Sequence, residues 1–176
     1  RIAVVASPEN LPAWEWVKWL PHAWSPTRSD GAGHARVIGS DASEVLAMLP
    51  LGERGPFSLS AEQALPHVVL VTDGVALPGT HALAREGGLQ GVTVLDLPTQ
   101  WGDVADVHHT RLLLQPTAGG GPSRLSVVRY GVDPRVGEAD ALSIAGAEAA
   151  ARRLVRGGLP TEEESGPRTV TSAELV

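Results

Sequence analysis

The sequence predicts an α/β domain with a mainly parallel sheet flanked by helices. Three short apolar runs, at residues 2–6, 67–72 and 92–95, have the length of β-strands. Each run is continuous rather than alternating, which is typical of strands buried on both faces. Segments with helical periodicity, at 11–20 and 141–156, separate or follow these runs. Because strands that alternate with helices form parallel sheets, we expect a Rossmann-like arrangement of three layers.

The composition is that of one globular domain, and it excludes several classes of function. The chain has 176 residues, of which 43% are hydrophobic and 19% charged, and its formal net charge is −6. The acidic balance argues against a nucleic-acid-binding surface, which would need a basic face. No apolar run approaches the roughly 18 residues of a membrane span, so no direct membrane insertion of this segment is expected. The chain has no cysteine, which excludes disulfides and cysteine-based zinc sites.

The most distinctive segment follows the first strand. Asn10 is expected to cap a helix over residues 11–20, which Pro21 ends. This segment holds four of the five tryptophans of the chain within eleven residues: Trp14, Trp16, Trp19 and Trp24. Helical periodicity predicts one apolar arc, opposite Glu15 and Lys18, that contains Trp16, Val17, Trp19 and Leu20.

Two interpretations of the tryptophan cluster stay open. In the first, the aromatic arc packs against the sheet as part of the core. In the second, Trp14 or Trp24, at the edge of the arc, forms part of a protein-docking surface, because aromatic residues are favoured in binding hot spots. Prolines in and around the segment would keep such a surface stiff: Pro12, Pro21 and Pro26. The four tryptophans are therefore the candidate interaction surface.

The middle of the chain predicts one further strand and one helix between loops. Residues 25–33 are polar and contain Gly and Pro, which indicates a loop, and residues 35–38 are a candidate strand. Asp41 followed by Glu44 is typical of a helix N-terminus. Residues 50–64 are expected to be irregular. The apolar stripe of the helix consists of Val45, Leu46, Met48 and Leu49.

The C-terminal third predicts an antiparallel hairpin and a final helix. Residues 111–115 and 124–130 have the pattern of strands, and the glycine-rich turn between them favours antiparallel pairing. A helix over 141–156 follows, with Ser143 as its candidate N-cap and two glycines after its end. Residues 161–176 contain three consecutive glutamates and are interpreted as a linker or tail.

Asp73 is the residue whose position most suggests chemistry. It follows the apolar run 68–71 and Thr72. In P-loop NTPases, an aspartate at the end of such a strand holds Mg²⁺ directly or through water. Asp73 and Gly74 also have the composition of an ordinary turn at a strand end. Asp73 is therefore a candidate Walker B-like residue for nucleotide or metal, with a structural turn as the alternative.

The phosphate-binding loop that would accompany such an aspartate is absent from the chain. A P-loop has the pattern Gly-x-x-x-x-Gly-Lys-Ser/Thr, and the only lysine is Lys18, with no glycine loop before it. Gly31 and Gly33 follow no predicted strand and indicate a surface loop. His108 and His109 are adjacent and no third ligand stands at metal-binding spacing, so no metal site is expected. No nucleophile and base are recognisable, and no catalytic residue is assigned.

A family resemblance rests on the tryptophan segment, whose residues 14–22 read Trp-Glu-Trp-Val-Lys-Trp-Leu-Pro-His. This run resembles the EccC family, membrane-anchored ATPases of the FtsK/SpoIIIE type that power type VII (ESX) secretion in actinobacteria and their relatives. The likeness extends over most of the chain, to residues 2–6, 67–74, 91–97 and 140–153. The tryptophan run is the specific part, and the other runs support it.

The resemblance implies a degenerate P-loop NTPase-like domain, which in that family lies between the transmembrane helices and the first ATPase module. On this mapping Asp73 matches the Walker B position, and the strand–loop–helix unit for the Walker A motif is expected upstream of Arg1. The chain is then a fragment of a larger protein, truncated at its N-terminus. We expect the domain over residues 1–158, with 159–176 as a linker toward the next module.

For function, the resemblance implies a non-catalytic coupling domain that links the membrane complex to the ATPase modules during protein export. The alternative is a working ATP-binding and ATP-hydrolysing domain whose P-loop lies upstream of this fragment. A third possibility is a generic Rossmann-like domain with an unrelated ligand. No cofactor is expected in this fragment, whereas the parent protein would use ATP and Mg²⁺.

The resemblance also implies partners and a location. The partners would be EccD-like and EccB-like membrane components of the secretion system and the ATPase modules of the same protein. Through the parent protein they would include secreted WXG-type proteins, and nucleic acid is not expected. The location would be the cytoplasmic side of the plasma membrane.

Overall fold

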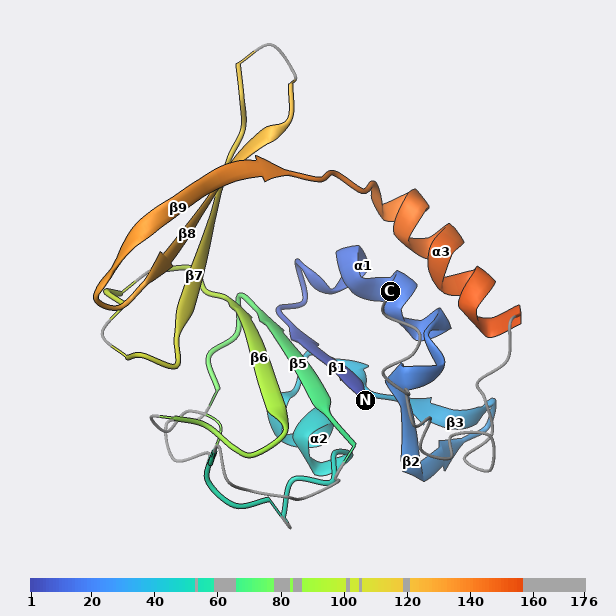
Figure 1. Cartoon of the computed structure of the whole chain (residues 1–176). Helices are drawn as coiled ribbons and strands as arrows, with labels where there is room; N and C mark the ends of the chain where they lie inside the picture. Colours follow the sequence, from blue (N-terminus) through green and yellow to red (C-terminus); the bar gives the residue numbers. More distant parts are fainter. Residues whose placement is uncertain are drawn as a thin grey trace, which may run out of the picture.

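A four-stranded parallel sheet lies near the middle of the computed structural model (Figure 1). The structure describes residues 1–52, 54–58, 66–77, 83, 87–100, 102–104, 106–118 and 121–156. The expected linker 159–176 and the domain boundary at 158 lie outside these residues, as does the fifth tryptophan, Trp101.

The parallel sheet confirms the predicted fold class. Its strands, in spatial order, are β4 (Ile38–Gly39), β1 (Ile2–Ala6), β5 (Val68–Asp73) and β6 (Val92–Leu97). Every neighbouring pair is parallel. Val4, Val71 and Leu95 are in register across β1, β5 and β6. Because side chains of in-register residues point to the same face, this row divides the sheet residues between two layers.

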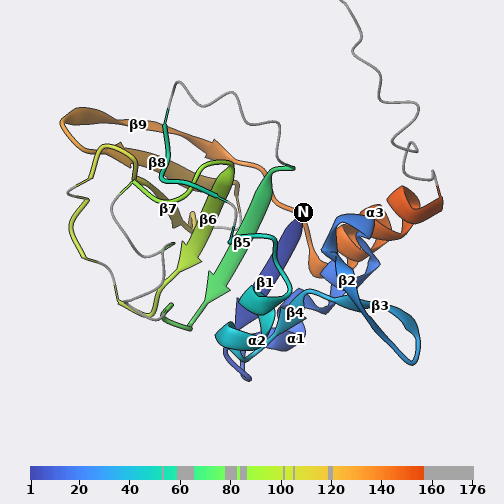
Figure 2. The same ribbon diagram turned by 90° about the horizontal axis from the view of Figure 1, so that it is seen from below.

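Helical segments lie on both faces of the sheet, as Figures 1 and 2 show. On one face, α2 (Ala42–Ala47) packs over a cluster whose buried members are Ala3, Val5, Val37, Val45, Leu46, Met48, Leu49, Val68, Leu70, Leu83 and Leu89. On the other face lies a second cluster, to which the sheet contributes Val4, Ala6 and Val71. The tryptophan segment contributes Val17, Leu20 and Ala23 to it, and α3 (Ile144–Arg156) contributes Ala151. The expected three layers are therefore present.

Two predicted helix caps are confirmed. Asp41 Oδ1 accepts the backbone N–H of Glu44 at 3.0 Å, at the start of α2. Ser143 directly precedes α3, and its Oγ accepts the backbone N–H of Gly146 at 3.1 Å. Each bond satisfies a backbone donor that has no partner within its helix. None of the described helices is long and apolar enough to cross a membrane.

The tryptophan segment is divided, and the prediction of one continuous helix over 11–20 is wrong. It consists of α1 (Leu11–Trp14) and two 3₁₀ segments, η1 (Glu15–Trp19) and η2 (Pro21–Ala23). Asn10 makes no side-chain cap, because its backbone is already helical (φ −92°, ψ −21°), whereas a side-chain cap requires an extended residue. In the tighter 3₁₀ turn, residues three apart point the same way. Trp16 and Trp19 therefore both pack against the second cluster.

The predicted loop over 25–33 is also wrong. β2 (Trp24–Asp30) pairs antiparallel with β3 (Gly33–Arg36). Asp30 Oδ1 accepts the N–H of Ala32 at 2.8 Å, which closes the turn, and Gly33 adopts φ +123°, a conformation that favours glycine. The predicted strand 35–38 is split between β3 and β4. Most of this hairpin is exposed, so it lacks the apolar pattern on which strand prediction depends.

A separate antiparallel sheet follows β6. The predicted hairpin is confirmed as β7 (Thr110–Gln115) and β8 (Ser123–Arg129), and a third strand, β9 (Val132–Ala139), continues it. The sequence did not predict β9, because Pro134, Gly137 and three charged residues interrupt any strand pattern there. In Figure 1, β9 leads over the parallel sheet toward α3, so that the two sheets and α3 enclose an open arch.

Candidate functional site

Asp73 lies at the carboxyl end of β5, and both oxygens of its carboxylate accept a hydrogen bond. Asn10 Nδ2 donates to Oδ1 at 2.7 Å. Trp14 Nε1 donates to Oδ2 at 2.8 Å. Asn10 precedes α1 and Trp14 is its last residue, so the candidate Walker B residue and the first tryptophan form one polar cluster. Asp73 is neither fully buried nor exposed.

The loop that joins β1 to α1 is held close to Asp73 by backbone contacts. The N–H of Ser7 donates to the carbonyl oxygen of Asp73 at 2.8 Å. Gly74 has φ +66°, and a Cβ there would lie 3.1 Å from Asn10 Nδ2 and 3.3 Å from Ser7 Oγ. A glycine is thus required where β5 ends, for its backbone conformation and for this close approach. β1 is therefore the strand next to β5, and the loop that follows β1 lies beside Asp73.

This loop lacks the features of a phosphate-binding loop. Its residues are Ser7, Pro8, Glu9 and Asn10, with neither glycine nor lysine. The N–H groups of Asn10 and Leu11 donate to the carbonyl oxygen of Ser7, so they are not free to surround a phosphate. The helix that follows has four residues. The expectation that a Walker A unit lies upstream of Arg1 stays a prediction.

A second carboxylate at the same edge is also engaged. Thr72 Oγ1 donates to Asp96 Oδ1 at 2.6 Å, which links β5 to β6. Because Thr72 and Asp73 are consecutive in a strand, their side chains point to opposite faces of the sheet. Within the described part of the chain, no group of three or more His, Asp or Glu side chains is placed to hold a metal ion. The role of Asp73 in metal or nucleotide binding stays a prediction.

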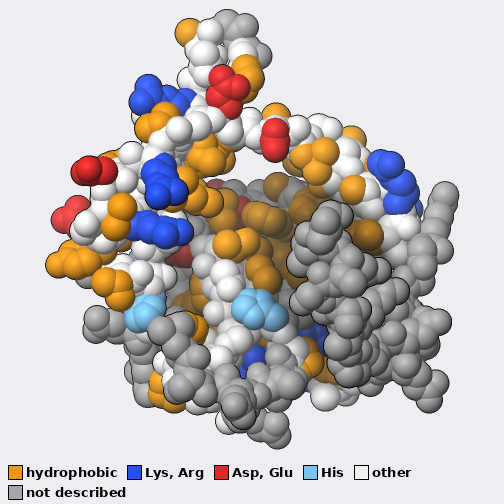
Figure 3. Space-filling view, in the orientation of Figure 1, with side chains coloured by type: hydrophobic (Ala, Val, Ile, Leu, Met, Phe, Trp, Pro, Cys, Tyr) orange, Lys and Arg blue, Asp and Glu red, His pale blue; other side chains and the backbone are white. Residues whose placement is uncertain are grey.

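Trp14 and Trp16 line an open pocket next to Asp73. Their ring centroids are 6.5 Å apart with an interplanar angle of 29°. The pocket has a volume of about 320 Å³, and its lining residues are Ala13, Trp14, Trp16, Asp73, Leu142, Ile144 and Ala147. Figure 3 shows hydrophobic side chains on the floor of the hollow beneath the arch. The pocket is at the carboxyl edge of a parallel sheet, where α/β domains usually bind ligands.

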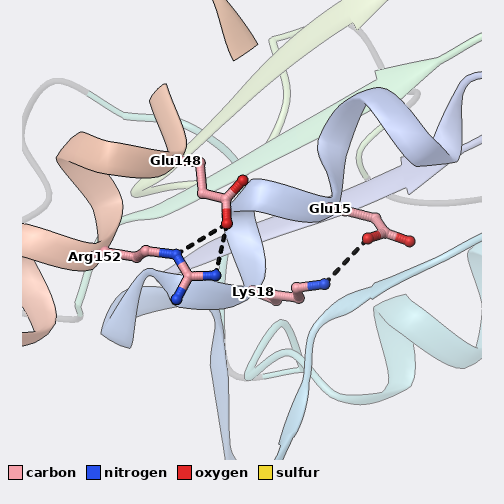
Figure 4. A network of polar contacts seen from close by, with 4 residues as sticks. All are labelled: Glu15, Lys18, Glu148 and Arg152. Carbon is pink, nitrogen blue, oxygen red and sulfur yellow. Dashed lines mark hydrogen bonds and ion pairs between the residues drawn. The ribbon is translucent and has the colours of Figure 1, made fainter. Parts of the chain in front are cut away.

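Trp19 is covered by the last helix. The guanidinium carbon of Arg152 lies 3.7 Å from the centroid of the Trp19 ring, a cation–π contact. Glu148 holds this guanidinium from the preceding turn of α3 through two hydrogen bonds of 2.9 and 2.7 Å to one carboxylate oxygen (Figure 4). The hydrogen bonds from Arg152 hold the pKa of Glu148 below its ordinary value. The same figure shows the ion pair of Lys18 and Glu15 at 3.0 Å.

Trp24 has partners of its own. It stacks on His34 with centroids 6.1 Å apart, and the guanidinium carbon of Arg36 lies 4.8 Å from its ring centroid. All four clustered tryptophans are half-buried. Their contacts differ: Asp73 for Trp14, the Trp14 ring for Trp16, Arg152 for Trp19 and His34 for Trp24. Of the four, Trp14 and Trp16 line the open pocket. Their use as an interaction surface stays a prediction.

Sequence reasoning missed Arg54, a buried arginine that is 7% exposed. Its guanidinium donates to the carbonyl oxygens of Pro50, Pro66, Gln90 and Gly91. These carbonyls belong to the segments that follow α2 and precede β5 and β6. A pattern of residue types gives no signal for such a residue, because all four acceptors are main-chain atoms.

Comparison with known proteins identifies the family. No protein-family model matches the chain. The ESX secretion system protein EccC of Thermomonospora curvata is 38% identical to it over 162 residues, which is 88% of this chain and 12% of that protein. The chain belongs to the EccC family. The EccC5 protein of the ESX-5 secretion system of Mycobacterium marinum is 40% identical over 106 residues, or 55% of the chain and 7% of that protein.

A third EccC protein gives the same result for another secretion system. EccCa1 of the ESX-1 system of Mycobacterium tuberculosis is 34% identical over 97 residues, or 55% of this chain and 12% of that protein. The chain thus spans about an eighth or less of the length of these EccC relatives. The relatives are components of ESX secretion systems, and this segment is common to several of them.

Proposed function

We propose that this chain is a non-catalytic coupling domain of a type VII secretion motor, placed between the membrane complex and the ATPase modules. The observation that supports it most is the engagement of Asp73 by Asn10 and Trp14. A Walker B aspartate must turn a carboxylate oxygen toward Mg²⁺ or its water. Here a metal would have to compete with two hydrogen bonds of 2.7 and 2.8 Å.

The second argument concerns the phosphates of a nucleotide. A P-loop surrounds them with free backbone N–H groups and a lysine. The loop beside Asp73 has no glycine or lysine, and the ammonium group of Lys18 is 3.0 Å from Glu15. The loop beside Asp73 therefore has no positively charged side chain that could take the place of that lysine.

The third argument is that the contacts of Asp73 connect the sheet to the tryptophan segment and α3. Asp73 ties the end of β5 to Trp14, and the next residues along the chain lead to Trp19, which Arg152 of α3 covers. A shift of α3 would therefore act on the tryptophan segment and, through Trp14, on the sheet. Contiguous packed and hydrogen-bonded groups of this kind can transmit a change of position between two ends of a domain.

The proposal includes partners and a location. A coupling domain would contact EccD-like and EccB-like membrane components on one side and the ATPase modules of its own protein on the other. Because those modules consume ATP, the domain would lie on the cytoplasmic side of the plasma membrane. The pocket beside Trp14 and Trp16 is the surface that we expect one of these partners to use.

The test compares ATP hydrolysis with protein export in the complete EccC protein that contains this segment. For Asp73→Asn we expect ATP hydrolysis within twofold of the wild type and export reduced at least tenfold, because coupling is damaged and chemistry is not. Asp103→Asn, at an exposed position away from the cluster, is the matched control and should leave both unchanged. If Asp73→Asn abolishes ATP hydrolysis as well, the segment is a working NTPase domain and the proposal is overturned.

Calorimetry with ATP and Mg²⁺ gives a second, independent measurement on the chain itself. We expect no heat of binding. Micromolar binding that disappears in Asp73→Ala would show that the aspartate still serves a nucleotide site.

A further inference from the structure

The antiparallel sheet has an exposed apolar face that the proposed function does not use. In β7 and β8, Leu112 is paired with Val127, and Leu114 with Leu125. Paired residues of antiparallel strands point to the same face, so these four side chains form one block on two neighbouring strands. Leu112 is 55% exposed and Leu114 is 63% exposed, whereas Leu125 and Val127 are half-buried. Contiguous exposed apolar residues of this kind mark interaction surfaces.

Two arginines border the apolar block on the same face. Val127 is paired with Arg135 of β9, and Thr110 with Arg129. Both arginines are exposed. We define the leucine–arginine face by six residues: Leu112, Leu114, Leu125, Val127, Arg129 and Arg135. Figure 3 shows hydrophobic and basic side chains over this sheet, together with acidic ones.

The charge of this face is opposite to that of the chain. The chain has a net charge of −6, yet both charged residues among these six are basic. Asp133, two residues before Arg135, lies in the stretch of β9 where the register with β8 shifts. Glu138 is paired with Arg124, and both alternate with residues of the leucine–arginine face along their strands, so they lie on the opposite face. The partner surface is therefore expected to be acidic and apolar at once.

The shape of the face suits a side chain from a partner. Leu125 is paired with Gly137, and a Cβ at Gly137 would meet no atom within 4 Å. The row across the three strands is Leu114, Leu125 and Gly137, so it ends on β9 at a residue without a side chain. An apolar side chain of a partner can pack on this row beside Gly137 while its neighbouring carboxylates reach the arginines.

We propose that the leucine–arginine face binds an acidic, amphipathic segment of a partner protein. Apolar side chains of that segment pack on Leu112, Leu114 and Leu125, and its carboxylates pair with Arg129 and Arg135. Arginine suits this role because its planar fork matches a carboxylate with two hydrogen bonds. An anionic membrane is a poorer fit, because such surfaces are usually recruited by four to eight basic residues. The inference holds whether or not the domain binds nucleotide.

The first measurement is a selection from a phage-displayed library of random twelve-residue peptides on the full chain. We expect enrichment of peptides that combine Asp or Glu with Leu, Ile, Val or Phe. The same selection on the variant Arg129→Gln with Arg135→Gln should lose the acidic residues. Selection of peptides without acidic residues, or of no peptides at all, contradicts the proposal.

The second measurement is the affinity of a selected peptide by fluorescence anisotropy. We expect at least tenfold weaker binding to Leu112→Ser with Leu114→Ser, and to the double arginine variant. The matched control is Leu113→Ser with Arg124→Gln, on the opposite face of the same strands, which should bind within threefold of the wild type. Circular dichroism melts establish that each variant is folded. Equal loss in the control overturns the proposal, as does binding of phosphatidylserine vesicles that depends on the same residues without any peptide binding.

Discussion

The indole N–H of Trp14 donates to Oδ2 of Asp73 over 2.8 Å, although the two residues are 59 positions apart in the sequence. Asn10 holds the other carboxylate oxygen at 2.7 Å. The tryptophan cluster and the candidate Walker B residue, which the sequence treats as separate features, therefore form one unit. This unit joins both ends of α1 to the end of β5, and Trp14 and Asp73 line the apolar pocket.

The first prediction concerns this hydrogen bond. Trp14→Phe removes the donor and keeps most of the ring. Because bonds to charged groups are stronger than neutral ones, we expect the free energy of unfolding to fall by about 1–2 kcal/mol. Urea denaturation followed by circular dichroism measures it. The matched control is Trp24→Phe, because the indole N–H of Trp24 is buried and has no hydrogen-bond partner among the described residues. It should cost less than Trp14→Phe.

A double-mutant cycle with Asp73→Ala, which removes the acceptor, separates the bond from the loss of ring contacts. If the two groups interact directly, the two substitutions together should cost less than the sum of their separate effects, by about 1 kcal/mol. Strict additivity would mean that the contact does not stabilise the fold, and would remove the main argument for a structural role of Asp73.

The second prediction concerns Arg54, whose guanidinium joins three segments at the amino ends of β5 and β6. In Arg54→Lys, one ammonium group cannot reach carbonyl oxygens that the guanidinium reaches with three nitrogens. Buried carbonyls would lose their partners, and we expect a loss of about 3 kcal/mol in the free energy of unfolding. Arg124→Lys, at an exposed position, is the control and should change it by less than about 0.5 kcal/mol.

A glycine beside Arg54 offers an independent check. Gly91 has φ +67°, and a Cβ there would lie 2.7 Å from Nη1 of Arg54. Gly91→Ala is therefore expected to destabilise the fold through backbone strain and displacement of the guanidinium. A variant as stable as the wild type would show that the position of Arg54 is not constrained as described.

The parts of the fold that the sequence predicted are those whose signals are local. β1 and most of β5 are continuous apolar runs, and the caps at Asp41 and Ser143 need only a side chain three residues before the bonded N–H. β6 is less regular, with Thr93 and Asp96 among its residues, and it is not buried on both faces as its apolar run predicted. Both kinds of signal lie within a few residues of the element they predict. The α/β class followed from their order along the chain.

The parts that were missed depend on distant contacts. β9 contains Pro134 and Gly137 and is a strand because β8 lies beside it. The tryptophan segment has helical periodicity, but it turns into 3₁₀ geometry where Trp16 and Trp19 must both reach the sheet. The candidate site shows the same limit, because no pattern around residue 73 indicates that Asn10 and Trp14 occupy its carboxylate.

The third prediction concerns Trp16, which is half-buried rather than fully enclosed. Removing a fully buried aromatic side chain costs about 3–5 kcal/mol, so we expect Trp16→Ala to cost about 2 kcal/mol. Tyr130, which is 55% exposed, is the control, and Tyr130→Ala should cost less than about 0.5 kcal/mol. A fully stable Trp16→Ala variant that has lost binding to secretion components would instead make Trp16 a docking residue.

The last prediction concerns pH and the connection between β6 and β7. Asp106 Oδ1 accepts the backbone N–H of His108 at 2.8 Å, and Oδ2 accepts that of Gly87 at 3.4 Å. The bond from His108 is the main cause that holds the pKa of Asp106 below its ordinary value. His109 Nε2 lies 3.7 Å from Oδ2 and acts in the same direction when it is protonated.

Because the folded-state pKa of Asp106 is lowered, its ionised form stabilises the fold. This contribution is fully present above the ordinary carboxyl pKa of about 4 and is lost as the pH falls through the lower pKa of the folded protein. Asp106→Asn should therefore be less stable than the wild type at neutral pH, and the difference should shrink steadily below about pH 4. Thermal melts between neutral and acidic pH measure it, with Asp103→Asn as the control. A difference that stays constant down to the lowest pH would show that ionisation of Asp106 does not stabilise this connection.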